Sequence, residues 1–192
     1  MDFEYEIKRF MEILPGEITE SRFRHSIRVA EYSELYAGVF RYSSPRKAYL
    51  AGLIHDITKQ KQDRFHIELF EESGFQYTDL PHRSYHAFSA PFYLMKNFQF
   101  EENEIFSAIS NHTLGGKNLP LLDKILYFCD YLGSDYFQKD PKKQEWIDQI
   151  QKSEFYGMNL KSSSTLKDLI EKNQEVHIST METYNESIHF LK

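Results

Sequence analysis

The sequence predicts an all-α fold, a bundle of helices without a sheet. Apolar residues recur at helical spacing along most of the chain, and no segment alternates apolar and polar residues at the period of a strand. Six prolines and eight glycines divide this pattern into segments of ordinary helix length. The 192 residues are therefore expected to form a single domain that spans 1–192.

Local signals bound the helices of the first half of the chain. Pro15-Gly16 should stop the first helix, and Thr19 can cap the second. Ser43 or Ser44 precedes Pro45, which suits the first position of the third helix, and Gly74 should end the fourth. The expected helices are 2–14, 20–39, 45–58 and 63–73.

Similar signals divide the second half. Pro91 should kink a helix that starts near 82, or mark a new start. Gly115-Gly116 and Gly133 should each end a helix, and the run Ser162-Ser163-Ser164-Thr165 should supply a break and a cap. The expected helices after the one near 82 are 101–112, 119–132, 142–156 and 163–191.

Composition excludes several function classes. The net charge is -6, with 29 acidic and 23 basic residues, which argues against a general nucleic-acid surface. Cys129 is the only cysteine, so no internal disulfide is possible, and a reducing, cytoplasmic setting is expected. The charged N-terminus does not resemble a signal peptide, and no apolar run approaches the ~18 residues of a membrane helix. The phosphate-binding loop, serine-nucleophile elbow and dinucleotide fingerprint are missing as well.

The most informative feature is a set of histidines and aspartates at helical spacings. Its members are His25, the pair His55-Asp56, His86, His112 and Asp130. Nitrogen and oxygen donors without cysteine suit divalent Fe, Mn, Mg or Zn. The adjacent His-Asp pair can bind one metal with both side chains, or let the carboxylate bridge to a second metal. Two metals a few Å apart are suited to in-line displacement at phosphorus.

Each of these residues also has an explanation that needs no metal. His25 shares a helix face with apolar neighbours and could be a hydrogen-bonded core residue, His86 could sit at a helix end, and Asp130 could be a buried salt-bridge partner. One shared metal centre explains all of them together. The other histidines are expected at the surface or in the tail; they are His66, His82, His177 and His189.

The ordered pattern resembles the HD superfamily of metal-dependent phosphohydrolases. Within it, the match is closer to the YqeK-type branch of symmetrical diadenosine tetraphosphate hydrolases. The segments that carry the resemblance are Arg22–His25, Leu53–Lys59, Tyr85–Ala87, Asn111–Gly115, Cys129–Tyr131 and, in the tail, His177–Asn185. They include HDxxK and HTxG motifs, and the resemblance spans about 20 to 190.

The resemblance implies an HD-domain helical bundle with a metal centre between helices. A metal-binding core would cover about 20–136 and a C-terminal helical extension 137–192. Two divalent metals, typically iron with Mn, Mg or Zn as alternatives, are implied. One would be held by His25, His55, Asp56 and Asp130, and the other by His86 and His112, with Asp56 as the bridge.

The implied reaction is symmetrical cleavage of diadenosine tetraphosphate to two ADP, by attack of a metal-bound hydroxide on phosphorus. The catalytic residues would be Asp56 and Lys59, and the substrate-binding residues Arg22, Lys59, Thr113 and Lys117. Lys59 and Arg22 each lie one helical turn from a ligand, although Lys59 could instead be a solvated helix-end lysine.

The chain departs from the family after Asp130. The family usually has an acidic residue and an arginine in the following turn, where this chain reads Tyr131-Leu132-Gly133-Ser134-Asp135-Tyr136. Two other functions stay open: an HD phosphohydrolase acting on mononucleotides or cyclic nucleotides, and a non-enzymatic nucleotide-binding sensor. A nucleotide is the expected partner in each case, without nucleic acid or membrane, and a homodimer is left open.

Overall fold

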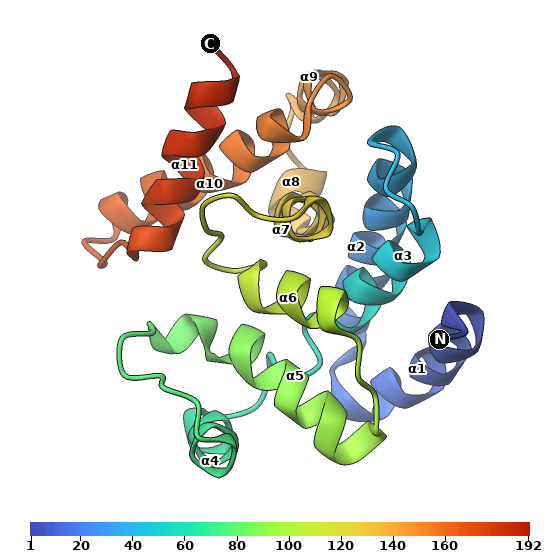
Figure 1. Cartoon of the computed structure of the whole chain (residues 1–192). Helices are drawn as coiled ribbons and strands as arrows, with labels where there is room; N and C mark the ends of the chain where they lie inside the picture. Colours follow the sequence, from blue (N-terminus) through green and yellow to red (C-terminus); the bar gives the residue numbers. More distant parts are fainter.

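The computed structural model describes residues 1–192 and contains helices and loops only, which confirms the all-α prediction (Figure 1). It has eleven α-helices and one short 3-10 helix, η1. In chain order they are α1 (Phe3–Glu17), α2 (Glu20–Val39), α3 (Pro45–Ile54), α4 (Asp63–Ser73), η1 (His82–Ser84), α5 (Tyr85–Phe98), α6 (Asn103–Asn111), α7 (Leu121–Gly133), α8 (Asp135–Gln138), α9 (Lys143–Ile150), α10 (Glu154–Glu171) and α11 (Ile178–Phe190). None of the helices combines the length and apolar character needed to span a membrane.

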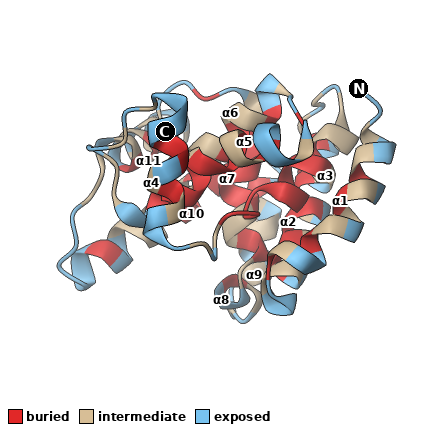
Figure 2. Cartoon of the chain, turned by 90° about the horizontal axis from the view of Figure 1, so that it is seen from below, coloured by how far each residue is buried: buried red, intermediate tan, exposed pale blue.

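Helix α7 lies at the centre of the molecule. It contacts α2, α3, α6, α8 and α10, and most of its residues are buried (Figure 2). A helix covered on nearly all sides needs apolar residues all round, which explains the apolar run from Ile125 to Leu132. Asp130 is the charged residue that interrupts this run, so the fold carries it into the middle of the bundle.

Close packing of α2 against α3 and α7 depends on two glycines. A Cβ atom on Gly52 of α3 would lie 2.7 Å from Cα of Ala30 in α2. A Cβ atom on Gly133 of α7 would overlap the side chain of Val29, also in α2. The three backbones can therefore approach more closely than side chains would otherwise permit, and this brings His25 toward the ends of α3 and α7.

The remaining helices cover this central group. Helices α5 and α6 pack against each other, α4 covers α5, and α1 packs on α3. At the other side, α10 packs on α7, and α11 pairs with α10 (Figure 1). The C-terminal pair thus reaches the centre of the bundle through α10.

Neither Pro15 nor Pro91 ends or starts a helix, so the predicted stop at Pro15 and the predicted new start at Pro91 were wrong. Helix α1 continues through Pro15 to Glu17, and the amide of Ile18 still donates to the carbonyl of Leu14. Helix α5 runs without interruption through Pro91, which is buried within it. Proline lacks the backbone N–H and so removes one hydrogen bond from the helix. A helix that is packed on its neighbours tolerates the loss of that hydrogen bond.

Some predicted helix ends were also wrong. Helix α3 ends at Ile54, not near 58, because the chain turns tightly there, with the amide of Lys59 bonded to the carbonyl of Asp56. The predicted break at Ser162–Thr165 is the interior of α10, and α9 and α11 are separate helices. The hydroxyls of Ser162 and Ser163 donate back to carbonyls one turn earlier, so they do not cap a new helix.

His66 was wrongly predicted to be at the surface. It is buried between α4 and α5, where its Nδ1 lies 2.7 Å from the hydroxyl of Ser89. The helix around it is rich in charges, but the face that carries His66, Leu69 and Phe70 packs inward. His82 and His189 are exposed as expected.

Candidate metal centre

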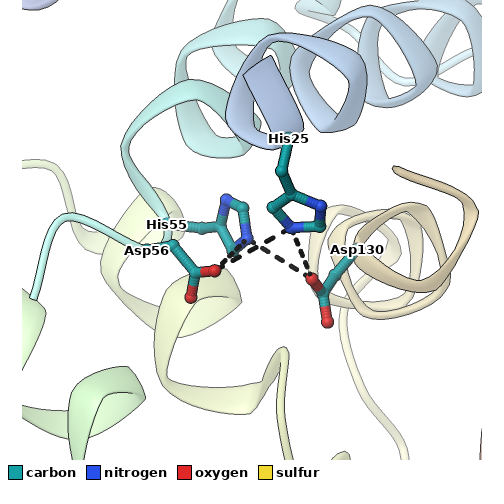
Figure 3. A group of neighbouring side chains, drawn as sticks. All are labelled: His25, His55, Asp56 and Asp130. Atoms are coloured by element: carbon teal, nitrogen blue, oxygen red, sulfur yellow. Dashed lines mark hydrogen bonds and ion pairs between the residues drawn. The ribbon is translucent and has the colours of Figure 1, made fainter. Parts of the chain in front are cut away.

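Four side chains from three parts of the bundle converge in a first group. His25 comes from α2, His55 and Asp56 from the turn that follows α3, and Asp130 from α7 (Figure 3). Nε2 of His25 lies 3.1 Å from Oδ1 of Asp130, and Nε2 of His55 lies 3.5 Å from the same oxygen. One donor atom from each of the four residues lies within 4.8 Å of all the others, a spacing at which they could hold a metal ion.

A second group lies directly beside the first and shares Asp56 with it. Nε2 of His86 and Nε2 of His112 lie 3.4 and 3.6 Å from Oδ1 of Asp56. The other oxygen, Oδ2, faces the first group and lies 3.8 Å from Nε2 of His25. The carboxylate of Asp56 therefore presents one oxygen to each group, which is the geometry of a bridging ligand.

Backbone carbonyls fix the ring orientation of three histidines. Nδ1 of His55 lies 2.7 Å from the carbonyl of Gly52, and Nδ1 of His112 lies 2.6 Å from that of Ile109. Nδ1 of His25 lies 3.1 Å from the carbonyl of Gly133. A carbonyl can only accept, so Nδ1 carries a hydrogen, and Nε2 faces the centre, where it can bind a metal when it is unprotonated.

Two buried atoms at the centre have no hydrogen-bond partner. They are Nε2 of His55 and Oδ1 of Asp56, which belong to the two groups described above. Burying such atoms without a partner costs free energy, and native proteins rarely leave them so. Divalent cations would satisfy both atoms, so the residues present fit a metal centre.

The charges of the centre also favour cations. Burial opposes ionisation of Asp56, yet the imidazoles of His55 and His112 hold the pKa of its carboxyl well below the usual range. Burial likewise opposes ionisation of Asp130, but Lys161 and the neighbouring histidines hold its pKa well below normal. Both carboxylates are therefore ionised at neutral pH. Burial acts against a charged His55, but the two carboxylates raise its pKa to about 9.

The first group opens into a polar cavity of about 570 Å³. Its wall holds the side chains of Arg22, Arg28 and Lys59 around His25, Asp56 and Asp130. Nη1 of Arg22 donates to Oδ2 of Asp56 at 2.8 Å, and Nζ of Lys59 lies 3.1 Å from Nε2 of His86. Cationic side chains beside a metal centre are suited to binding an anionic group such as a phosphate.

The other two residues expected to bind substrate lie in different places. The hydroxyl of Thr113 lies 3.1 Å from Nε2 of His86 and 3.0 Å from Nε2 of His112, next to the second group. Lys117 is exposed and lines a separate pocket with residues of α11. The structure therefore brings Arg22, Lys59 and Thr113 to the centre, but it does not bring Lys117 to the cavity.

Two cationic residues at the centre were missed from the sequence. Arg28 follows His25 by three positions and so shares its helix face; it donates to the carbonyl of Gly133 and to Asp135. Lys161 is buried in α10 and donates to Oδ2 of Asp130 at 2.6 Å. Its position three residues after Met158, on the apolar face of α10, was the available signal.

Comparison with known proteins finds relatives that match nearly the whole chain. The chain is 27% identical to the symmetrical bis(5'-nucleosyl)-tetraphosphatase of Halalkalibacterium halodurans, over 92% of this chain and 94% of that one. It is 26% identical to the Bacillus subtilis protein of the same name, over 88% and 90%. A crystal structure from Clostridium acetobutylicum, described as a predicted HD superfamily hydrolase involved in NAD metabolism, has the same fold, with a TM-score of 0.85, 24% identity and coverage of 96% and 97%.

The model of one family matches the part of the chain that carries the centre. The HD domain model matches residues 22–135, which is more than half of the 192 residues. That range includes all the residues of both groups, from His25 to Asp130. The chain belongs to the HD domain family of metal-dependent hydrolases.

Proposed function

We propose that this protein is a metal-dependent phosphohydrolase that cleaves diadenosine tetraphosphate symmetrically to two ADP. The observation that carries the proposal is the position of Asp56, whose two oxygens face two adjacent groups of nitrogen and oxygen donors. A pair of such groups is suited to displacement at phosphorus. The names of the two bacterial relatives support the choice of substrate.

The proposed cofactors are two divalent cations, with iron as the expected metal and Mn, Mg or Zn as alternatives. His25, His55, Asp56 and Asp130 would hold one, and Asp56, His86 and His112 the other. When bound, such cations polarise phosphate oxygens and lower the pKa of a coordinated water, which can then attack phosphorus. Asp56 is the bridging ligand in this scheme.

The protein's own cations would hold and orient the substrate. Lys59 and Arg22 line the cavity beside the two groups, so they are placed to bind the non-bridging oxygens of a phosphate chain. Thr113 carries a hydroxyl next to the second group and can donate to a phosphate held there. A few separate cations suit a short phosphate chain better than a nucleic-acid strand.

The symmetrical cut follows from how a phosphate chain would lie at the centre. An inner phosphorus has a phosphate group on each side, so its non-bridging oxygens and those of both neighbours would lie within reach of the metals and the cations of the cavity. Attack at an inner phosphorus, with departure of the other half, yields two equal products. The turn at Tyr131–Tyr136 differs from the family pattern, so other dinucleoside tetraphosphates are also expected to be cleaved.

The test is a product analysis with protein loaded with Fe²⁺ or Mn²⁺. Diadenosine tetraphosphate should give ADP as its only nucleotide product, and a chelator or the Asp56→Asn substitution should abolish the reaction. Equal amounts of AMP and ATP would refute the symmetrical cut. Hydrolysis of mononucleotides or cyclic nucleotides without turnover of the dinucleotide would assign the protein to a different HD phosphohydrolase activity.

A further inference from the structure

Lys161 connects the C-terminal helices to both groups of the centre. It lies in α10, outside the segment 22–135 that matches the HD domain, and only 6% of its surface is exposed. Its Nζ donates to Oδ2 of Asp130 at 2.6 Å and to the backbone carbonyl of His112 at 2.7 Å. The ammonium also lies 4.6 Å from the ring centre of Tyr127. The buried ammonium therefore has two oxygen acceptors and one aromatic ring beside it.

The contact with Asp130 divides the roles of its two oxygens. Oδ1 faces Nε2 of His25 and Nε2 of His55, whereas Oδ2 is turned away from the histidines and accepts from Lys161. A carboxylate without such a partner could offer both oxygens to one metal ion. The ammonium of Lys161 holds Asp130 in the orientation that offers only one.

Ligation by a single oxygen has a chemical consequence. Catalytic metal sites keep at least one position open for water or substrate, whereas structural sites are closed by protein ligands. The first group already supplies four side chains, and a second oxygen from Asp130 would compete for an open position. Lys161 also places a positive charge beside a ligand, which weakens metal binding in the same group.

We propose that Lys161 is a positioning residue that restricts Asp130 to one-oxygen ligation and so keeps a metal position open to substrate. The proposal rests on the metal centre of the proposed function and extends it to the C-terminal helices. Removal of Lys161 should therefore strengthen metal binding while it slows turnover. If Lys161 merely held α10 in place, its removal would weaken metal binding and slow turnover together.

The test uses Lys161→Met, which removes the charge and keeps an unbranched buried side chain. Lys161→Gln is the second variant, because its shorter, uncharged side chain also removes the ammonium beside Oδ2 of Asp130 and does not depend on the first variant folding. Lys167→Met is the control, since Lys167 is an exposed lysine of the same helix that pairs only with Glu171. Metal-depleted full-length protein is titrated with Mn²⁺, and turnover of diadenosine tetraphosphate is measured separately, with thermal unfolding as the check on folding.

In the Lys161 variants, the dissociation constant for Mn²⁺ should fall about tenfold or more, because a unit charge beside a divalent cation is removed. Their kcat should fall by about tenfold to a hundredfold, the usual range for a lost partner of a metal ligand. Lys167→Met should match the unmodified protein in its dissociation constant for Mn²⁺ and in its kcat. Weaker Mn²⁺ binding, or unchanged binding, in either folded Lys161 variant would overturn the proposal.

The metal titration needs no substrate, so it separates this inference from the proposed activity. If the unmodified protein fails to cleave the dinucleotide and the variants still bind Mn²⁺ more tightly, the effect of Lys161 on metal binding stands and the proposed substrate is wrong. If cleavage occurs but Mn²⁺ binding does not change, the proposed activity stands and the role of Lys161 is wrong.

Discussion

His25 and Asp130 are 105 positions apart in the sequence, yet Nε2 of the first lies 3.1 Å from Oδ1 of the second. The contact depends on direct packing of α2 on α7, which the glycine at position 133 makes possible. Asp56 joins them from the turn after α3. The arrangement leads to separate, measurable expectations for each part of the centre.

Replacement of Asp56 should empty both metal sites. Asp56→Asn keeps the shape of the side chain but removes the charge that faces both groups, so elemental analysis should show loss of metal from the two sites together. Asp123→Asn is the matched control. Asp123 is also a buried aspartate, but Ser107 and Asn111 donate to it away from the centre. Full metal content in Asp56→Asn would contradict the bridging role.

Loss of a histidine from the second group should remove one metal only. His112 contributes Nε2 to that group and not to the first, so His112→Ala should retain about half of the metal and lose activity. His66→Ala is the control, because His66 is equally buried but contacts Ser89 instead of the centre. Elemental analysis that finds both metals still present in His112→Ala would remove His112 from the ligand set.

Replacement of Lys59 should lower activity toward the substrate and leave the metal content unchanged. Lys59→Met removes a cation from the cavity, and a hydrogen bond to a charged group is worth about 1.5–3 kcal/mol. We therefore expect kcat/KM for diadenosine tetraphosphate to fall about tenfold to a hundredfold, with metal content unchanged. Lys61→Met is the comparison, since Lys61 pairs with Glu17 outside the cavity. An equal loss in the two variants would show that no specific contact is made by Lys59.

Metal binding should strengthen as the pH rises. His55 binds metal only when Nε2 is unprotonated, and the neighbouring carboxylates raise its pKa to about 9. Below that pH a proton competes with the metal, so the apparent affinity should rise by about tenfold per pH unit between pH 6 and 8. Titrations with Mn²⁺ at several pH values measure this. Affinity independent of pH in that range would mean that His55 is not a ligand.

Replacement of Gly52 by alanine, the smallest possible substitution, should lower the stability of the protein. In Gly52→Ala the new Cβ would meet the backbone of Ala30, so α3 must shift away from α2, at a cost of about 1–3 kcal/mol in the free energy of unfolding. Gly38→Ala, in α2 but with open space around the new methyl group, should be neutral or stabilising. Denaturant unfolding measures both, and equal stability of the two variants would contradict the close approach of α2 and α3.

The sequence predicted the helices best where capping residues mark them. Thr19 caps α2 and Ser44 caps α3, and Gly74 follows α4 in the left-handed conformation that favours glycine. Prediction from the sequence failed where tertiary packing overrides the local preference of residues for a helix end. Pro91 lies inside α5, and the serines at 162 and 163 bond to their own helix, so neither ends it.

The convergence of the six candidate ligands could be predicted, because their residue types and spacing pointed to one shared centre. The surrounding cations could be predicted only in part. Lys117 has the charge of a phosphate-binding residue but lies in a separate pocket with α11, and no local pattern reports that distance. Lys161 was missed because the sequence shows only a lysine on an apolar helix face. Its contact with Asp130 is visible only in the folded structure.

The loop after His112 is held by the last helix of the chain. The amide of Gly116 donates to the hydroxyl of Thr183, and the hydroxyl of Thr180 donates to the carbonyl of Leu114. Both threonines are buried in α11. During synthesis the residues of the two groups therefore leave the ribosome well before the segment that secures their surroundings. The loop beside the centre should therefore reach its final conformation late in folding, only after α11 has been synthesised and has packed against it.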